Sequence, residues 1–154
     1  MIRTEAEYQE ALNRLRDEKK RMLDQKKRLK DKGFNSDQIE TAMEPMESFH
    51  LQLVEEVDAY ERIKRGDIGE LQNLHGLGRM LVALRIARGL TQTDLATRLG
   101  VDVSQVSRDE KNEYHGVTVD RATRILDALN ANLKSKPEAP IFPEKDPNEN
   151  KRVA

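Results

Sequence analysis

Apolar side chains recur at helical spacing through the first half of the chain, in two long runs. Between residues 5 and 32 one apolar residue returns every seven positions, and neither Pro nor Gly interrupts the run before Gly33. Between residues 36 and 65 apolar residues stand three and four apart, up to Gly66. Such spacings place one apolar stripe on one face of an α-helix. We therefore expect two long helices joined by a turn near Asn35, each about 40 Å long at about 1.5 Å per residue.

Short polar signals mark where these helices begin and end. Thr4 followed by Glu7 has the pattern of a capping box, and Ser36 can cap the second helix. Gly33 suits the left-handed conformation that ends a helix. Pro45 falls inside the second run, so either the helix kinks there, or a short helix ends and a new one begins with Pro45 in its first turn.

The two stripes match in an antiparallel register, with the first helix basic and the second acidic. In this register Tyr8 faces Tyr60, and the other apolar residues pair in turn toward the bend. Residues 34–66 hold 3 Lys and Arg against 8 Asp and Glu, whereas residues 1–33 hold 11 against 7, so the flanks attract. The expected core of this arm, or of a dimer built on it, is Leu15, Met22, Leu29, Ile39, Met46, Leu53 and Tyr60.

A lone two-helix hairpin buries little apolar surface, so residues 1–66 are expected to pack against something else. We favour an oligomerisation arm that pairs with a second copy, or a partner-binding arm. The alternative is a charged hairpin that packs only on itself. The basic run of residues 19–32 could instead contact nucleic acid, although interspersed charge on a helix is more typical of a solvated face.

The second half of the chain contains shorter periodic runs. Leucines at helical spacing from Leu71 to Leu81 predict a helix that begins there, despite Gly76 and Gly78, and ends at Gly89. A further run after Thr118, which can act as its cap, closes the segment of residues 67–133.

Two short capped runs lie between these helices. Thr91 can cap the first run, and Asp102, with Gln105 three residues later, can cap the second. Gly100 separates the runs, and the small Ala96 lets the two helices cross closely. A turn this short, with a glycine in it, is typical of a helix–turn–helix that presents its second helix to a major groove.

The outer face of that second helix carries side chains suited to DNA. Val106 must point inward, which leaves one exposed face made of Val103, Ser104, Ser107, Arg108 and Lys111. Arg108 can donate two hydrogen bonds to guanine, and a serine hydroxyl can either donate or accept a hydrogen bond. Gln92, at the start of the preceding helix, is placed to bond a phosphate, as are the free amides of that helix.

These residues resemble the phage repressor (Cro/CI-like, XRE) helix–turn–helix family over about residues 77–131. The resemblance rests on Thr91-Gln92, Leu95-Ala96, Leu99-Gly100-Val101, Val106-Ser107-Arg108 and Glu110. It implies a five-helix domain, an Arg85–Glu110 pair across the core, and a loop after the second helix that runs along the DNA backbone. The candidate DNA-binding residues are Gln92, Thr93, Val103, Ser104, Gln105, Ser107, Arg108, Lys111, Tyr114 and His115.

One residue departs from the family pattern. Asp109 stands where the family usually has an apolar residue, and it could pair with Arg108 or Arg124. Residues 67–133 are also not basic overall, with 8 Lys and Arg against 9 Asp and Glu, which disfavours strong non-specific binding to nucleic acid.

Composition narrows the remaining classes of protein. Charged residues make up 36% of the 154 positions and aromatic residues 4%, which suits long solvated helices better than one compact core. Cysteine is absent, which excludes disulfides and thiolate metal sites. No apolar run approaches the roughly 18 residues of a membrane span, and the first ten residues lack a secretory signal. We expect a soluble cytoplasmic protein with no membrane partner.

No catalytic cluster is visible in the sequence. His50, His75 and His115 are far apart and lack the paired spacing of metal ligands. The glycines of residues 66–78 follow no strand and lack a phosphate-binding pattern. We therefore expect no enzyme, no cofactor and no metal.

The sequence thus predicts an all-α protein: a helical hairpin in residues 1–66, a helix–turn–helix domain in residues 67–133, and a disordered tail in residues 134–154. In that tail Ile141 and Phe142 form either a docking element or part of an idle segment. The expected function is a sequence-specific transcriptional repressor that binds double-stranded DNA as a homodimer on a palindromic operator. The alternatives are an antitoxin that binds its toxin through the arm and regulates its own operon, and a structural interaction protein that has lost DNA binding.

Overall fold

The computed structural model describes residues 1–136 of the chain, and these are all-helical with no strand. The expected disorder of residues 134–154, and the expected roles of Ile141 and Phe142, lie almost wholly outside the described residues. The elements are α1 (Glu5–Asp31), α2 (Ser36–Lys64), α3 (Leu77–Ala87), α4 (Gln92–Leu99), α5 (Val103–Lys111) and α6 (Val119–Ala128).

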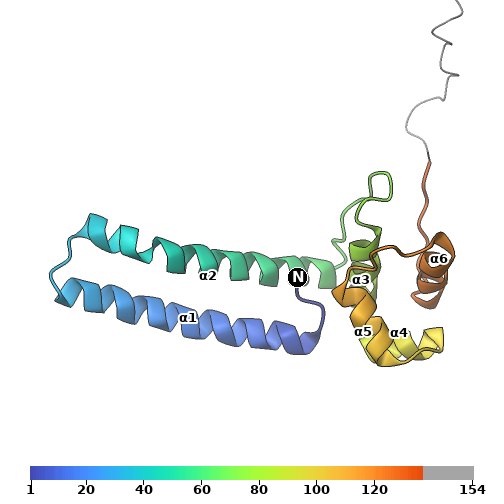
Figure 1. Cartoon of the computed structure of the whole chain (residues 1–154), viewed down its shortest axis with the longest axis horizontal. Coiled ribbons are helices and arrows are strands. Elements are labelled where there is room, and N and C mark those ends of the chain that lie inside the picture. The colour runs from blue at the N-terminus through green and yellow to red at the C-terminus, as the bar shows by residue number, and fades with distance from the viewer. Residues whose placement is uncertain (137–154) are drawn as a thin grey trace, which may run out of the picture.

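Helices α1 and α2 form a long antiparallel hairpin, which we call the arm (Figure 1). The expected capping box is present, since the Thr4 side chain accepts from the Glu7 amide and the Glu7 carboxylate accepts from the Thr4 amide. The rings of Tyr8 and Tyr60 stack with their centroids 5.0 Å apart, as the antiparallel register requires. Residues far apart in sequence are thereby paired at the base of the arm.

Two expectations about the ends and course of the arm helices are corrected or resolved. Asn35, and not Ser36, caps α2: its side chain accepts from the Gln38 amide at 2.9 Å, while Gln38 bonds back to the Asn35 amide. Asn is as good a cap as Ser, and the backbone of Asn35 has the extended conformation that a cap needs. Pro45 lies inside a single helix, so α2 does not end there.

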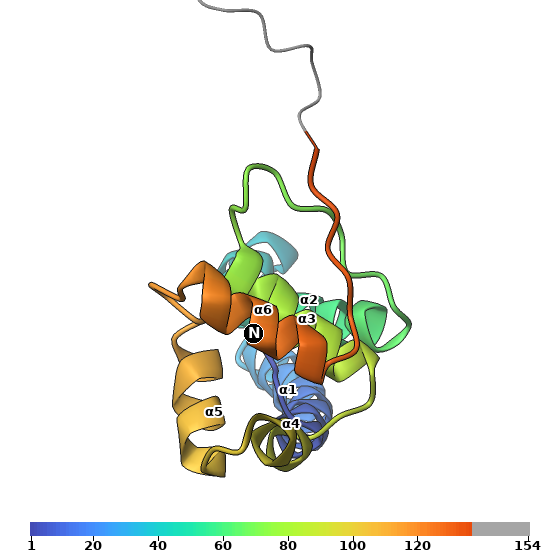
Figure 2. The ribbon, with the colours of Figure 1, turned by 90° about the vertical axis from the view of Figure 1, so that its right-hand side faces the viewer.

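Helices α3 to α6 form the second part of the molecule, which we call the domain (Figure 2). Its first helix begins only at Leu77, six residues later than the leucine spacing suggested. Asn73 and Leu74 both have positive φ, and Gly76 has φ 79°, so the backbone of this segment is a turn and not a helix. A bridge between Gln72 and His75 closes that turn.

The domain contains four helices among the described residues, one fewer than the five that the resemblance implied. Helix α6 ends at Ala128 with Leu129 as its C-cap, and Asn130 follows in the left-handed region with φ 49°. That conformation stops the helix, and residues 131–136 continue without helical structure.

The arm and the domain share one hydrophobic core. The buried cluster contains Val57 and Tyr60 from the arm together with Leu81, Leu95 and Val106 from the domain. The first residues of the chain extend it, because Ile2 is only 5% exposed and belongs to the same cluster. The base of the arm is therefore held against the domain by apolar packing, while the far end of the arm projects away from it (Figure 1).

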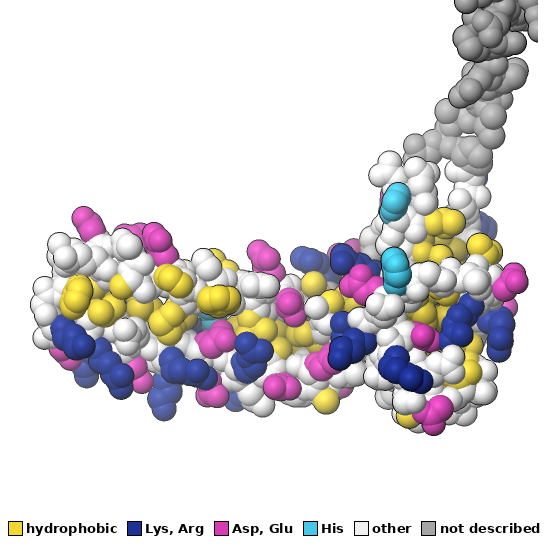
Figure 3. Space-filling view, viewed as in Figure 1, with side chains coloured by type: hydrophobic (Ala, Val, Ile, Leu, Met, Phe, Trp, Pro, Cys, Tyr) yellow, Lys and Arg dark blue, Asp and Glu magenta, His cyan; other side chains and the backbone are white. Residues whose placement is uncertain are grey.

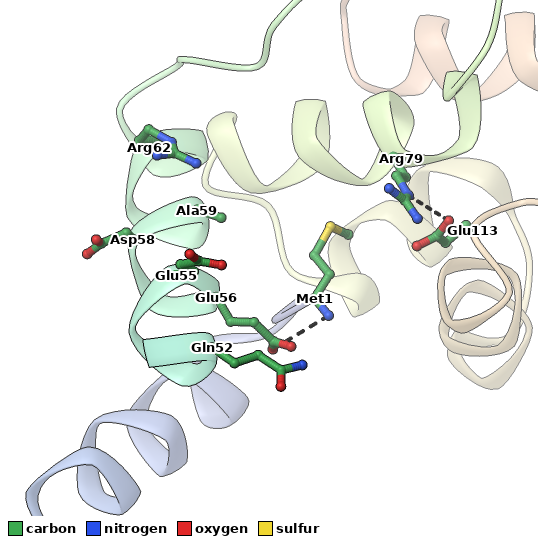
Figure 4. Close-up of a pocket in the computed structure, with 9 residues that line it drawn as sticks. All are labelled: Met1, Gln52, Glu55, Glu56, Asp58, Ala59, Arg62, Arg79 and Glu113. Carbon is green, nitrogen blue, oxygen red and sulfur yellow. Dashed lines mark hydrogen bonds and ion pairs between the residues drawn. The ribbon is translucent and has the colours of Figure 1, made fainter. Parts of the chain in front are cut away.

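Polar contacts lie on both sides of the junction near the first residue, one within residues 1–66 and one within the domain (Figure 4). The Met1 amino group lies 3.6 Å from Glu56 of α2. Close by, Arg79 of α3 bonds to Glu113 in the loop after α5, at 2.7 Å. A cavity of about 740 Å³ lies between these residues. None of the helices in the described residues is both long enough and apolar enough to cross a membrane.

Candidate nucleic-acid interface

Helices α4 and α5 meet across a tight turn whose ends are fixed by caps. The Thr91 side chain accepts from the Asp94 amide at the start of α4, and Asp102 accepts from the Ser104 amide at the start of α5. Gly100 ends α4 with φ 67°, a conformation that glycine adopts without steric cost. Leu95 and Ala96 are buried where the two helices cross. The turn therefore sets the direction of α5 from local bonds and packing.

One face of α5 is packed into the domain and the other is open. Val106 is 2% exposed and Glu110 is 0% exposed, so this edge is buried. Exposed side chains on the open face come from the residues expected there, namely Val103, Ser104, Ser107, Arg108 and Lys111. Figure 2 shows α5 standing at one side of the domain, beside α3 and α6. An α-helix with a free polar face of this kind has the shape that enters a major groove.

Arg108 is available for a ligand. Its Nε donates to the Ser104 carbonyl oxygen at 3.3 Å, and among the described residues no carboxylate lies within ion-pair distance of it. The guanidinium thus keeps most of its donors free on the exposed face, beside the hydroxyls of Ser104 and Ser107. Those are the groups that recognise base edges and phosphate oxygens.

A buried ion pair anchors α5 to the rest of the molecule. Arg85 of α3 donates from Nε to Glu110 Oε1 at 2.5 Å and from Nη2 to Oε2 at 2.7 Å. Arg85 also donates to the carbonyl oxygens of Leu90 and Arg3. The pairing implied by the resemblance is therefore present. It joins α5 to α3, to the loop before α4 and to the start of the chain, so the orientation of α5 depends on these three segments.

Gln92 belongs to this network rather than standing free. Its Nε2 donates to Glu110 Oε2 at 2.8 Å, so Glu110 accepts three hydrogen bonds in all. This holds the first residue of α4 close to α5. Its contact with a phosphate remains a prediction, and one side-chain N–H stays available for it.

Asp109 is paired, but with neither of the arginines expected. Arg121 of α6 donates to Asp109 Oδ2 at 2.5 Å, and the two side chains are 42% and 31% exposed. Arg108 instead donates to the Ser104 carbonyl oxygen of its own helix, and Arg124 lies one turn further along α6 than Arg121. The aspartate therefore ties α5 to α6 at the position where the family pattern has an apolar contact.

Tyr114 is the one candidate DNA contact that the structure contradicts. It is only 5% exposed and packs in the shared core, and its hydroxyl is buried without a hydrogen-bond partner. Burial, with the charges of Glu110 and Asp109 nearby, raises the pKa of its phenol well above the ordinary value. The backbone explains the error: Glu113 and Tyr114 both have positive φ, which turns the ring inward.

The other candidates lie where a ligand could reach them. Thr93, Lys111 and His115 are exposed, whereas Gln105 is half-buried on the side of α5 next to Val106. Their roles in binding remain predictions. Within the described residues no three His, Cys, Asp or Glu side chains are grouped to hold a metal ion.

Sequence reasoning missed Arg121 and Arg3. Arg121 follows the cap of α6 by three residues and gave no signal, because its partner Asp109 lies on another helix. Arg3 lies beside the start of α4, in a hollow of about 360 Å³ that is also lined by Thr93 and Val103. Only the folding of the arm against the domain brings Arg3 there, so no local pattern could have identified it.

Comparison with known proteins identifies one segment. Residues 81–134 match the family model described as Helix-turn-helix, which covers α4, α5 and α6 and most of α3. Comparisons with curated proteins and with solved structures find no match.

Proposed function

Because residues 81–134 belong to the phage repressor (Cro/CI-like, XRE) family of helix–turn–helix domains, a family of DNA-binding regulators, we propose that this chain is a sequence-specific transcriptional repressor acting in the cytoplasm. The single observation that supports it best is the open face of α5. Arg108 there is exposed and has no acidic partner among the described residues, while the opposite edge of the helix is held by Glu110. Base reading is assigned to Val103, Ser104, Ser107 and Arg108.

Phosphate contacts are assigned to the flanks of this face. Gln92 and Thr93 begin α4, where free backbone amides favour an anion, and Lys111 and His115 follow α5. Tyr114 is not among them. Residues 67–133 carry nearly balanced charge, so the proposed protein depends on specific contacts more than on general attraction to the DNA backbone.

We further propose that the repressor acts as a homodimer on a palindromic operator, with the arm as the dimerising element. Two recognition helices of a dimer read half-sites about 34 Å apart, or a multiple of that spacing. The support is the arm itself: Leu15, Met22, Leu29, Met46 and Leu53 are only half-buried within a single copy. A hairpin whose apolar side chains are only half-buried is stabilised when a further layer of helices covers them.

The direct test is selection of bound sequences from a random DNA pool, followed by affinity measurements on the selected site. Arg108→Ala is expected to weaken specific binding by about 1–3 kcal/mol and to relax the preference at one base position. The matched control is Arg124→Ala, since Arg124 is also an exposed arginine but lies on α6. The proposal fails if the wild-type chain enriches no sequence at low and moderate salt, or if both variants lose the same affinity.

A further inference from the structure

The far half of α2 exposes a face without any charged residue. Positions 41, 42, 45, 48, 49 and 52 are separated by one, three or four residues, so they lie on one side of the helix. We call this the neutral face; it consists of Thr41, Ala42, Pro45, Ser48, Phe49 and Gln52, and all six are exposed. In a chain with 36% charged residues, and on a helix with many more acidic than basic residues, such a face requires an explanation.

A groove with an apolar floor and a charged rim runs beside the neutral face. It has a volume of about 400 Å³, and its apolar lining comes from Met22 of α1 and from Met46, Phe49 and Leu53 of α2. The rest of its lining is polar, namely Gln52, Glu56 and the ion pair between Arg14 and Glu18, whose charged atoms lie 3.7 Å apart. Phe49 is 71% exposed at its edge, although a buried phenylalanine gains about 1.5–3 kcal/mol of transfer free energy. Figure 3 shows the hydrophobic side chains as a band between the two helices of the arm, with Lys and Arg side chains below it along α1.

The chemistry of this surface selects its occupant. In a two-fold dimer the same patch meets itself, so any charge on the patch faces a like charge on the partner. Arg21 and Arg28 on α1 would repel their own copies, whereas the neutral face can lie against itself without that cost. Arg14 at the rim of the groove is already paired with Glu18. Its small residues, Ala42 and Ser48, let a second helix approach closely, and Phe49 supplies the large side chain that fills the groove.

We propose that the neutral face of α2 and the adjoining groove are where a second copy of this chain docks, so that two arms form one four-helix bundle. This deepens the homodimer of the proposed function and rests on it. The occupant is the same neutral face of the other copy, with its Phe49 reaching a groove lined by Met22, Met46 and Leu53. When two hairpins join in this way, each covers the half-buried apolar side chains of the other with a second layer of helices.

The test is sedimentation velocity of the full chain, comparing wild type with Phe49→Glu and Leu51→Glu. Wild type is expected to be a dimer, and Phe49→Glu to dissociate with a Kd raised at least about 30-fold, as for a central interface residue. Leu51 is the matched control, because it is also apolar and 61% exposed but lies off the neutral face, on the acidic side of α2. Leu51→Glu is expected to associate like wild type.

A wild-type monomer at the highest soluble concentration overturns the proposal, and so does equal dissociation of both variants. Thermal unfolding followed by circular dichroism checks that the variants fold; if Phe49→Glu does not, Ala42→Arg places a charge on the same face and must dissociate instead. Binding to a DNA duplex with a single half-site separates this inference from the proposed function. Phe49→Glu is expected to bind the half-site like wild type, whereas Arg108→Ala is expected to remain a dimer and lose the site.

Discussion

Glu110 is the side chain whose removal should affect folding most. It is fully buried and accepts two hydrogen bonds from Arg85 and one from Gln92. Glu110→Ala leaves the buried guanidinium without its partner, and we expect unfolding free energy to fall by about 3–5 kcal/mol. Urea denaturation measures this loss. Glu113→Ala breaks the exposed pair with Arg79, and its cost should stay below about 1 kcal/mol. Equal losses in the two variants would contradict the assignment of Glu110 as the anchor of α5.

For Tyr114 we expect a substitution to raise the free energy of unfolding, and not to lower it. Its hydroxyl is buried without a partner, so Tyr114→Phe removes an unsatisfied polar group and keeps the ring. Stability should rise by about 1 kcal/mol, which is the lower end of the cost of such a group. DNA affinity should not change, because the ring lies in the core. If Tyr114→Phe lost DNA affinity and gained no stability, Tyr114 would be a DNA contact and not a core residue.

At the scale of the helices, α3 depends on a close approach at Gly78. A Cβ atom built there would lie 1.7 Å from the carbonyl oxygen of Glu113, in the loop after α5. Gly78→Ala must push that loop away, and we expect a loss of about 1–3 kcal/mol or more. Thermal unfolding checks this against Met80→Ala, a substitution on the same helix that makes no such clash. If Gly78→Ala is as stable as wild type, the loop after α5 is not held against α3.

The cap of α5 gives the domain a pH dependence of known sign. Hydrogen bonding by the side chain and then by the backbone amide of Ser104 lowers the pKa of Asp102 below its ordinary value. Because the pKa is lower in the folded state, Asp102 stabilises the fold at pH values above its unfolded pKa of about 3.9. This stabilisation is lost as the pH falls through the folded pKa. Asp102→Asn keeps an acceptor but cannot titrate. The difference in urea midpoint between wild type and Asp102→Asn should therefore shrink from pH 7 to pH 3, and a growing difference would refute the assignment.

The helices that sequence reasoning placed well are those with local signals. Thr4, Thr91, Asp102 and Thr118 all act as caps, because capping bonds join residues only two or three positions apart. The start of α3 was wrong because helical spacing of leucines does not reveal the positive φ of Asn73 and Leu74. Periodicity measures which face is apolar, and it does not measure whether the backbone between two apolar residues is helical.

The same limit applies to the candidate interface. The exposed face of α5 followed from one buried position, Val106, and helical geometry. The burial of Tyr114 and the Asp109–Arg121 pair depend instead on how a loop and a third helix fold back. Contacts of that kind are made between segments that are distant in sequence, so a local pattern carries no record of them.

At the scale of the whole molecule, the shared core predicts that the arm and the domain unfold together. Tyr60 is 5% exposed, stacks on Tyr8 and belongs to the cluster that includes Leu81 and Leu95. Tyr60→Ala should cost about 3–5 kcal/mol and lower hydrogen-exchange protection in α4 and α5 as well as in the arm. Phe34→Ala, at the exposed far end of the arm, should change protection only locally. Loss of protection confined to the arm in Tyr60→Ala would show that the two parts are independent.

The bond from Arg85 to the carbonyl oxygen of Arg3 has a consequence for how such a chain can diversify. The guanidinium that orients α5 also binds the backbone at the start of the arm, and Ile2 fills the core beside it. A recombination event that exchanged the arm or the domain for a foreign segment would remove one side of these contacts. The two halves should therefore be inherited as a unit, and variation should accumulate at the far end of the arm and on the open face of α5.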